Sequence, residues 1–335
     1  MKKNICEQDA RLDNALVFCI EGLSRSQAQA MILGSLVKVN ELIVTKVAFQ
    51  VRRGDSIHYD LLEPDNEDSP KNLVKENSRT LDILFEDEDY LVINKAAGLT
   101  VHPGAGTPLS ETLVNDLILA EKLTKWDLPP KIQACDAEFR PGVVHRLDKE
   151  ASGAMLLLKN PALFESTKDL FKNNKIKRGY LALSWGAIDY PQLKNRLQNF
   201  LELRSFALKI EDKKLEIESL LGRHPVKRKK QAVLKDKGRR AHSAIELIKS
   251  NTTVSLYGVK IATGRTHQIR VHLSFLGVPI VGDRIYGKKK DLCEQMFLHA
   301  RELSFEHPKT NKTLVVSAPL SDKRKELLLK HELML

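Results

Sequence analysis

Hydrophobic residues recur with two different periods along the chain, and this divides it into parts. Near the N-terminus, residues 11–22 carry apolar side chains at helical spacing. Ser24 and Gln27 have the spacing of a capping box, so a second helix carrying Arg25 should start there. A short strand and turn follow this helix. The pattern predicts a small α+β domain at residues 1–60.

A different pattern begins after residues 61–80, whose polar, proline-containing composition is typical of a linker. Residues 81–95 predict two strands around an acidic turn, and such a turn is more often a solvated loop than a metal site. The chain ends in an amphipathic helix or tail at residues 321–335, which leaves residues 81–320 as the main domain. The charged, leucine-rich stretch at 190–220 is not assigned.

The stretch Gly142–Gly153 places charged residues between two apolar runs. Val143 and Val144 predict a short strand, and residues 154–158 predict a second one. Asp148 would therefore lie where a strand meets a loop. By itself, an aspartate in such a place is usually a helix cap or a surface residue.

Two further clusters carry side chains suited to chemistry. Tyr180 lies on a predicted strand. A later strand is followed by a glycine turn and a predicted helix at about residues 266–277. His267 and Arg270 are three residues apart and should share a face of this helix.

The charge of the chain is concentrated in one segment. The formal net charge is +11, and residues 223–240 hold nine Lys or Arg and one Asp. Such concentration indicates a surface that binds phosphate groups, rather than charge spread for solubility. The centre of this segment is a run of four cations, Lys227, Arg228, Lys229 and Lys230.

Several function classes are disfavoured. The four cysteines are far apart and form no CxxC pair, which argues against a zinc site and a disulfide framework and favours a reduced, cytoplasmic location. We expect no membrane span and no signal peptide. The segment Gly282–Lys289 has the glycine and lysine spacing of a phosphate loop, but Lys289 stands where the magnesium-binding hydroxyl belongs. We expect no metal and no cofactor.

The N-terminal segment resembles the S-four RNA-binding domain, a small module of ribosomal proteins and RNA-modifying enzymes. The resemblance implies that residues 1–60 bind RNA. The residues that carry it are Arg11, Leu12, Asp13, Ser24, Arg25, Val37, Val39, Asn40, Gly54 and Asp55.

Three motifs of the main domain are specific only when they are considered together. HRLD at 145–148, GYLAL at 179–183 and GRTHQIR at 264–270 resemble, in order and character, the motifs of RNA pseudouridine synthases of the large-subunit ribosomal RNA type. The resemblance covers nearly the whole chain. It departs at Ala151, where the family usually has Thr. The implied fold is α+β, with a mixed, mostly antiparallel central sheet and the small N-terminal domain added to it.

The resemblance also implies roles for individual residues. Asp148 would be the nucleophile that converts a flipped-out uridine to pseudouridine without any cofactor. Tyr180 would stack on the extruded base and help remove the proton from the ring carbon. Arg270 would pair with Asp148, since a cation within about 4–6 Å keeps a carboxylate ionised. The sequence does not distinguish attack on the base, attack on the sugar and abstraction of a sugar proton. The expected RNA-binding set is Arg146, Arg25, Arg265, His267, Lys227, Arg228, Lys229 and Lys230.

The expected partner is RNA, most of all ribosomal RNA, and the chain is expected to act as a monomer. Two alternatives stay open: the same chemistry on transfer RNA, and a non-catalytic RNA-binding factor in ribosome assembly.

Overall fold

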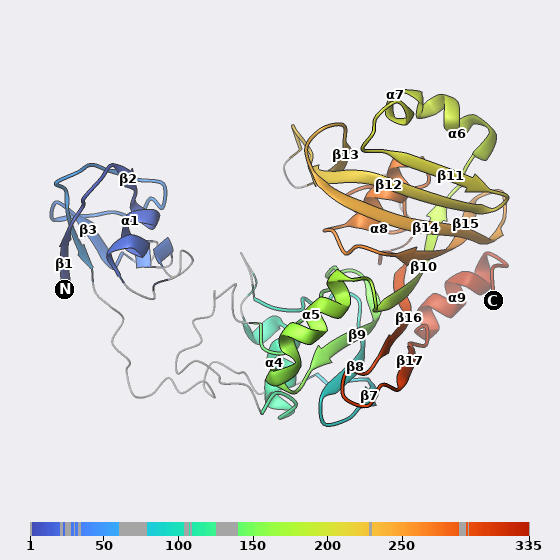
Figure 1. Cartoon of the computed structure of the whole chain (residues 1–335), viewed down its shortest axis with the longest axis horizontal. Helices are drawn as coiled ribbons and strands as arrows, with labels where there is room; N and C mark the ends of the chain where they lie inside the picture. The colour runs from blue at the N-terminus through green and yellow to red at the C-terminus, as the bar shows by residue number, and fades with distance from the viewer. Residues whose placement is uncertain are drawn as a thin grey trace. The chain divides into compact units, whose positions relative to one another are not determined.

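We analysed a computed structural model of the 335-residue chain (Figure 1). The residues it describes are 2–20, 23, 28–29, 31–32, 35–59, 79–103, 107, 109–124, 140–227, 230–287, 293 and 295–334. The chain splits into two compact units, described separately below. The first unit is Met1–Arg79, His102–Lys122 and Asp127–Pro141, and the second is Thr80–Val101, Leu123–Trp126 and Gly142–Leu335.

The N-terminal part of the first unit is a small α+β module. The helix expected at residues 11–22 is confirmed as α1 (Leu12–Cys19). A four-stranded sheet has the order β1-β6-β3-β4, and β2 pairs with β5. The strands are β1 (Lys2–Ile5), β2 (Ala10–Arg11), β3 (Val37–Val39), β4 (Leu42–Ile43), β5 (Gln50–Val51) and β6 (Ser56–Tyr59). The expected cap at Ser24 and Gln27, and Arg25 itself, lie outside the described residues.

This module has a core of its own. Leu12, Leu16 and Ile57 are fully buried within it. Asp13 is buried beside them and accepts hydrogen bonds from Arg11 Nε (3.0 Å) and Gln29 Nε2 (3.0 Å), which compensate its lost hydration. Elsewhere in the first unit, η1 (Leu109–Glu111) leads into α4 (Leu113–Leu119).

The second unit is built on one large sheet. Its order is β11-β12-β14-β15-β10-β16-β9-β8-β7, with β13 on β12 and β17 on β16. All these pairs are antiparallel except β16 with β9, so the expected mixed, mostly antiparallel sheet is confirmed. Its strands are β7 (Ile83–Glu86), β8 (Tyr90–Lys95), β9 (Ser152–Leu158), β10 (Lys177–Trp185), β11 (Ala207–Glu211), β12 (Lys214–Arg223), β13 (Gln231–Leu234), β14 (Arg239–Ser250), β15 (Val254–Ile261), β16 (Leu298–Glu306) and β17 (Thr313–Ser317).

The helices of this unit flank the sheet. Asn160 caps η2 by accepting from the Ala162 N–H (3.1 Å). The unassigned residues 190–220 form two short helices and most of two strands. No described helix has the length and hydropathy needed to span a membrane. The helical segments are η2 (Pro161–Leu163), α5 (Phe164–Lys172), α6 (Tyr190–Arg196), α7 (Gln198–Leu201), α8 (Gln268–Phe275) and α9 (Asp322–Lys330).

The strand expected at Val143–Val144 is wrong, because this segment caps the edge of β9 without joining the sheet. The N–H of Leu158 donates to Gly142 O (2.9 Å), and the N–H of Leu156 donates to His145 Nε2 (2.9 Å). Burial lowers the pKa of His145 to about 3, so its imidazole is neutral and can accept this hydrogen bond. A side chain thus takes the place of a neighbouring strand.

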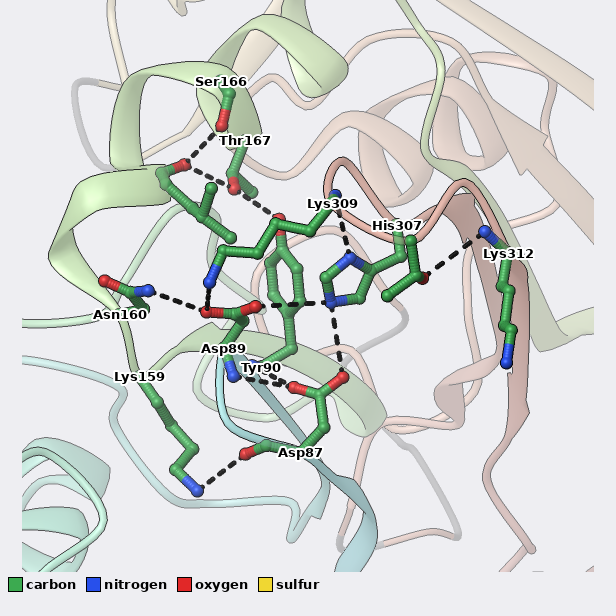
Figure 2. Close-up of polar contacts among 12 residues, drawn as sticks. Asp87, Asp89, Tyr90, Lys159, Asn160, Ser166, Thr167, His307, Lys309 and Lys312 are labelled. Carbon is green, nitrogen blue, oxygen red and sulfur yellow. Dashed lines mark hydrogen bonds and ion pairs between the residues drawn. The ribbon is translucent and has the colours of Figure 1, made fainter.

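The acidic turn between β7 and β8 is not a solvated loop, because Asp89 is buried in a polar cluster (Figure 2). Asp89 Oδ1 accepts from Lys309 Nζ (2.6 Å) and Asn160 Nδ2 (2.7 Å). His307 Nε2 lies 3.4 Å from Asp87 Oδ2. Burial raises the pKa of Asp89, but these hydrogen bonds outweigh it and lower the pKa below its ordinary value. The cluster ties the β7–β8 turn to the turn after β16.

The parallel contact between β9 and β16 is made by residues directly after the Asp148 loop. Ser152 faces His299 and Gly153 faces Ala300. Gly153 has a φ of +111°, and a Cβ there would lie 2.2 Å from the carbonyl oxygen of Ala300. Only glycine allows the two backbones to approach this closely.

We therefore expect Gly153→Ala to lower the free energy of unfolding by roughly 3 kcal/mol or more, since the backbones must separate. Gly98→Ala is the matched control: Gly98 has a φ of +86° but nothing within 4 Å of an added Cβ. It should cost only about 1–2 kcal/mol. Urea unfolding followed by tryptophan fluorescence measures both, and equal losses would contradict the steric explanation.

Candidate active site

Asp148 lies on a tight loop that is held in place by hydrogen bonds. The Ala151 N–H donates to Asp148 O (3.1 Å), which closes the turn. The buried Lys95 donates from Nζ to three carbonyl oxygens, including that of Lys149 (3.1 Å). Ala151 itself is 1% exposed, so its methyl group is buried in the loop. These contacts fix the loop directly after Asp148.

Arg270 connects Asp148 to a second carboxylate. Its Nη1 donates to Asp148 Oδ2 (3.0 Å), while Nε and Nη2 bind Asp283 Oδ2 (2.7 Å) and Oδ1 (2.9 Å). The bidentate contact of Arg270 is thus made with Asp283, while Asp148 receives a single hydrogen bond. Burial lowers the pKa of Arg270, but hydrogen bonds and charges of the two aspartates outweigh it and raise the pKa above its ordinary value. The guanidinium is permanently charged and held at three of its nitrogens.

Asp283 is in turn fixed by backbone groups. Its Oδ1 accepts from the N–H groups of Ile285 (2.9 Å) and Tyr286 (3.0 Å). Burial raises the pKa of Asp283, yet the contacts with Arg270 and these amides outweigh it and hold the pKa below its ordinary value. Asp283 positions Arg270, and Arg270 positions Asp148.

Tyr180 lines the same small cavity of about 90 Å³. It lies on β10 and is 8% exposed, while the Asp148 side chain is 17% exposed. Burial raises the pKa of Tyr180, so the phenol stays protonated near neutral pH. The structure therefore brings the three expected catalytic residues Asp148, Tyr180 and Arg270 to one cavity.

The N-terminus of α8 forms another wall of the cavity. His267 has a φ of +57°, a strained value for a residue with a side chain. Its Nδ1 lies 2.9 Å from the Tyr286 hydroxyl, and burial lowers the pKa of its imidazole. Gln268 holds the preceding turn by accepting from the Arg265 N–H (3.1 Å).

The expected RNA-binding residues divide into two groups. Arg146, Arg265 and His267 line the cavity. Lys227 is an exposed residue of the β12–β13 turn, and Lys230 Nζ lies 5.5 Å from the centre of the Tyr286 ring. The other members, Arg25, Arg228 and Lys229, lie outside the described residues.

Sequence reasoning missed three residues of this region: Asp283, Tyr286 and Arg178. Asp283 and Tyr286 fall in the segment considered only as a phosphate loop. A carboxylate directly after the apolar run VPIVG could have indicated a buried partner for a cation. Arg178, two residues before Tyr180 on β10, also lines the cavity.

Among the described residues, no group of three or more His, Cys, Asp or Glu side chains has a geometry that could hold a metal ion. The arrangement places one oriented carboxylate beside a fixed cation in a cavity that Tyr180 also lines.

The fold defines the class of protein. Human RNA pseudouridylate synthase domain-containing protein 4 superposes with a TM-score of 0.52 at 21% identity, covering 76% of this chain and 94% of that one. The chain therefore has a pseudouridine synthase fold.

Sequence comparison defines the family. The RNA pseudouridylate synthase family model matches residues 89–275, and the S-four domain model matches residues 10–57. An uncharacterized RNA pseudouridine synthase of Bacillus subtilis is 31% identical over 96% of this chain and 94% of its own length. Ribosomal large subunit pseudouridine synthase D of Zymomonas mobilis is 30% identical over 92% and 90%. The chain belongs to the RNA pseudouridine synthase family of isomerases.

The double contact of Arg270 should not tolerate lysine. Arg270→Lys keeps the charge but cannot bind Asp283 with a fork and Asp148 with a third nitrogen. We expect kcat to fall by about 10²-fold through misorientation of Asp148, with RNA affinity nearly unchanged. Single-turnover pseudouridine formation and filter binding measure the two quantities. Arg301→Lys, at an exposed arginine of β16, is the control and should leave both unchanged; an active Arg270→Lys enzyme would contradict the positioning role.

Proposed function

We propose that this chain converts uridine to pseudouridine in large-subunit ribosomal RNA, with Asp148 as the nucleophile. The observation that carries the proposal is the 3.0 Å contact between Asp148 and Arg270 in a cavity bounded by Tyr180. Arg270 orients the carboxylate of Asp148, because its other nitrogens are fixed on Asp283.

The reaction exchanges one bond for another. The bond between the uracil ring nitrogen and the ribose carbon breaks, the base turns, and a ring carbon bonds to the same ribose carbon. That ring carbon loses one proton and the ring nitrogen gains one, so atoms and electrons balance without an oxidant or an energy source. Asp148 acts while the glycosidic bond is broken.

Tyr180 serves as the surface on which the extruded uracil stacks. Its raised pKa keeps the phenol protonated, which makes it a poor proton acceptor near neutral pH and argues against the expected help in removing the ring proton. Stacking offsets part of the few kcal/mol that unstacking a base costs. Arg146, exposed beside the cavity, is suited to occupy the place that the base leaves.

The proposal of a ribosomal RNA substrate is supported by the names of relatives and by the positive charge of the chain. Relatives from Zymomonas mobilis and Borreliella burgdorferi are named ribosomal large subunit pseudouridine synthase D. We propose that residues 1–60 form an RNA-binding domain joined by a linker at 61–80 to a catalytic domain at 81–320, with a tail at 321–335. We further propose that the chain acts as a monomer in the cytoplasm. Mapping pseudouridines in RNA from cells lacking the protein tests the substrate, and losses confined to transfer RNA would overturn it.

The nucleophile can be tested by a change of one atom group. Asp148→Asn keeps the size of the side chain but removes its negative charge, so pseudouridine formation should fall by ~10³-fold or more. RNA binding should persist, because the binding surfaces are unchanged. Single-turnover release of tritium from [5-³H]uridine-labelled RNA measures the reaction. Activity within a few-fold of the unaltered enzyme would refute the assignment.

The basic turn can be tested by salt dependence. If Lys227 and Lys230 each contact a phosphate, replacing both with Gln should reduce the slope of log K against log salt by roughly 1.4–1.8. Lys323→Gln with Lys330→Gln removes two exposed cations of α9 and is the matched control. Equal slope changes in both double variants would show that only net charge matters.

A further inference from the structure

Arg178 is a buried cation of the cavity that the proposed mechanism does not use. It lies on β10, two residues before Tyr180, and is 8% exposed. Its guanidinium carbon lies 5.4 Å from the centre of the Phe171 ring. Because residues two apart on a strand share a face, Arg178 and Tyr180 point to the same side of the sheet. Their Cα atoms are about 6.6 Å apart along the strand.

The guanidinium of Arg178 is poorly satisfied. Nη2 donates to Ala262 O at 3.4 Å, a long hydrogen bond, and the buried Nε has no partner. Among the described residues no carboxylate forms an ion pair with it, whereas Arg270 in the same cavity binds two. Burial lowers the pKa of Arg178, which expresses the cost of holding this charge away from water. A buried, uncompensated cation with free donors is suited to an anion that arrives from outside.

The adjoining turn places a glycine beside the guanidinium. A Cβ at Gly264 would lie 3.0 Å from Nη1 of Arg178, so the backbone here passes close to the guanidinium. The glycine keeps this side of the guanidinium free of a side chain. Both Gly264 and Arg178 line the cavity that holds Asp148.

We propose that Arg178 binds a phosphodiester group of the RNA next to the flipped uridine, and so anchors the backbone of the nucleotide whose base stacks on Tyr180. This inference rests on the proposed function. The ligand is the phosphate and not the uracil, because the base is neutral and leaves the buried charge uncompensated, whereas each phosphodiester carries one negative charge. Arg178 thus holds the backbone while Asp148 acts on the sugar–base bond.

The test changes one phosphate at a time. An RNA oligonucleotide containing the mapped target uridine is made with a neutral methylphosphonate linkage on the 5′ side, on the 3′ side, or on neither side. Binding is measured with the full chain carrying Asp148→Asn, so that the RNA is not converted. We expect one of the two neutral linkages to weaken binding about 10-fold or more, the worth of one hydrogen-bonded charge pair.

Changing Arg178 in the protein completes a double-mutant cycle with the change of linkage in the RNA. With Arg178→Gln added, natural RNA should bind about as weakly as the sensitive neutral RNA, and the neutral linkage should cause no further loss. Lys177→Gln, an exposed cation one residue away on β10, should keep the full 10-fold sensitivity. A purely structural role for Arg178 would lower binding of all RNAs equally and leave the sensitivity to the linkage intact.

Two results would overturn the proposal: equal binding of all three RNAs by the protein with Arg178, or undiminished sensitivity in the Arg178→Gln protein. The first measurement involves no change at Arg178, so it holds even if Arg178→Gln fails to fold. The readout is binding by a protein without the proposed nucleophile. Failure of the Arg178 assignment is therefore separable from failure of the Asp148 assignment, which is read from tritium release.

Discussion

One guanidinium organises the candidate active site, because Arg270 divides its nitrogens between two carboxylates. Two nitrogens hold Asp283, which is anchored by backbone amides, and the third reaches Asp148. Were Arg270 bound to Asp148 alone, both side chains could move together and the carboxylate would have no fixed direction. Asp283 makes the pair rigid. The direction of Asp148 is therefore set by a residue 13 positions beyond Arg270, on a separate turn.

Much of this arrangement could be predicted from local patterns. Strands around the β7–β8 turn, the β9 and β10 strands and helix α8 follow from hydrophobic period, because each buries one face or both. The joint site of Asp148, Tyr180 and Arg270 was expected only from the resemblance to the pseudouridine synthases, since each motif alone is weak. The strand predicted at Val143–Val144 was wrong, because apolar character alone does not reveal that His145 replaces a strand as hydrogen-bond acceptor.

Other features depend on contacts that no local pattern contains. Asp283 looked like part of a failed phosphate loop, since its partner Arg270 is identified only when α8 packs beside the turn. Asp89 looked like a solvated acid, since Lys309 comes 220 residues later. Arg178 is notable because no carboxylate among the described residues pairs with its buried charge. A missing partner of this kind can be recognised only in the three-dimensional structure. Long-range electrostatics thus sets the limit of sequence reasoning here.

The parallel contact of β9 with β16 has a consequence for biosynthesis. Ser152, at the end of the Asp148 loop, meets His299 from 147 residues further along the chain. The ribosome makes the chain from its N-terminus, so the small N-terminal module, with its own core, can fold well before β16 exists. A nascent or truncated chain ending before β16 has no strand to close the loop. The N-terminal module can therefore fold while the loop that carries Asp148 is still without its contacts to β16.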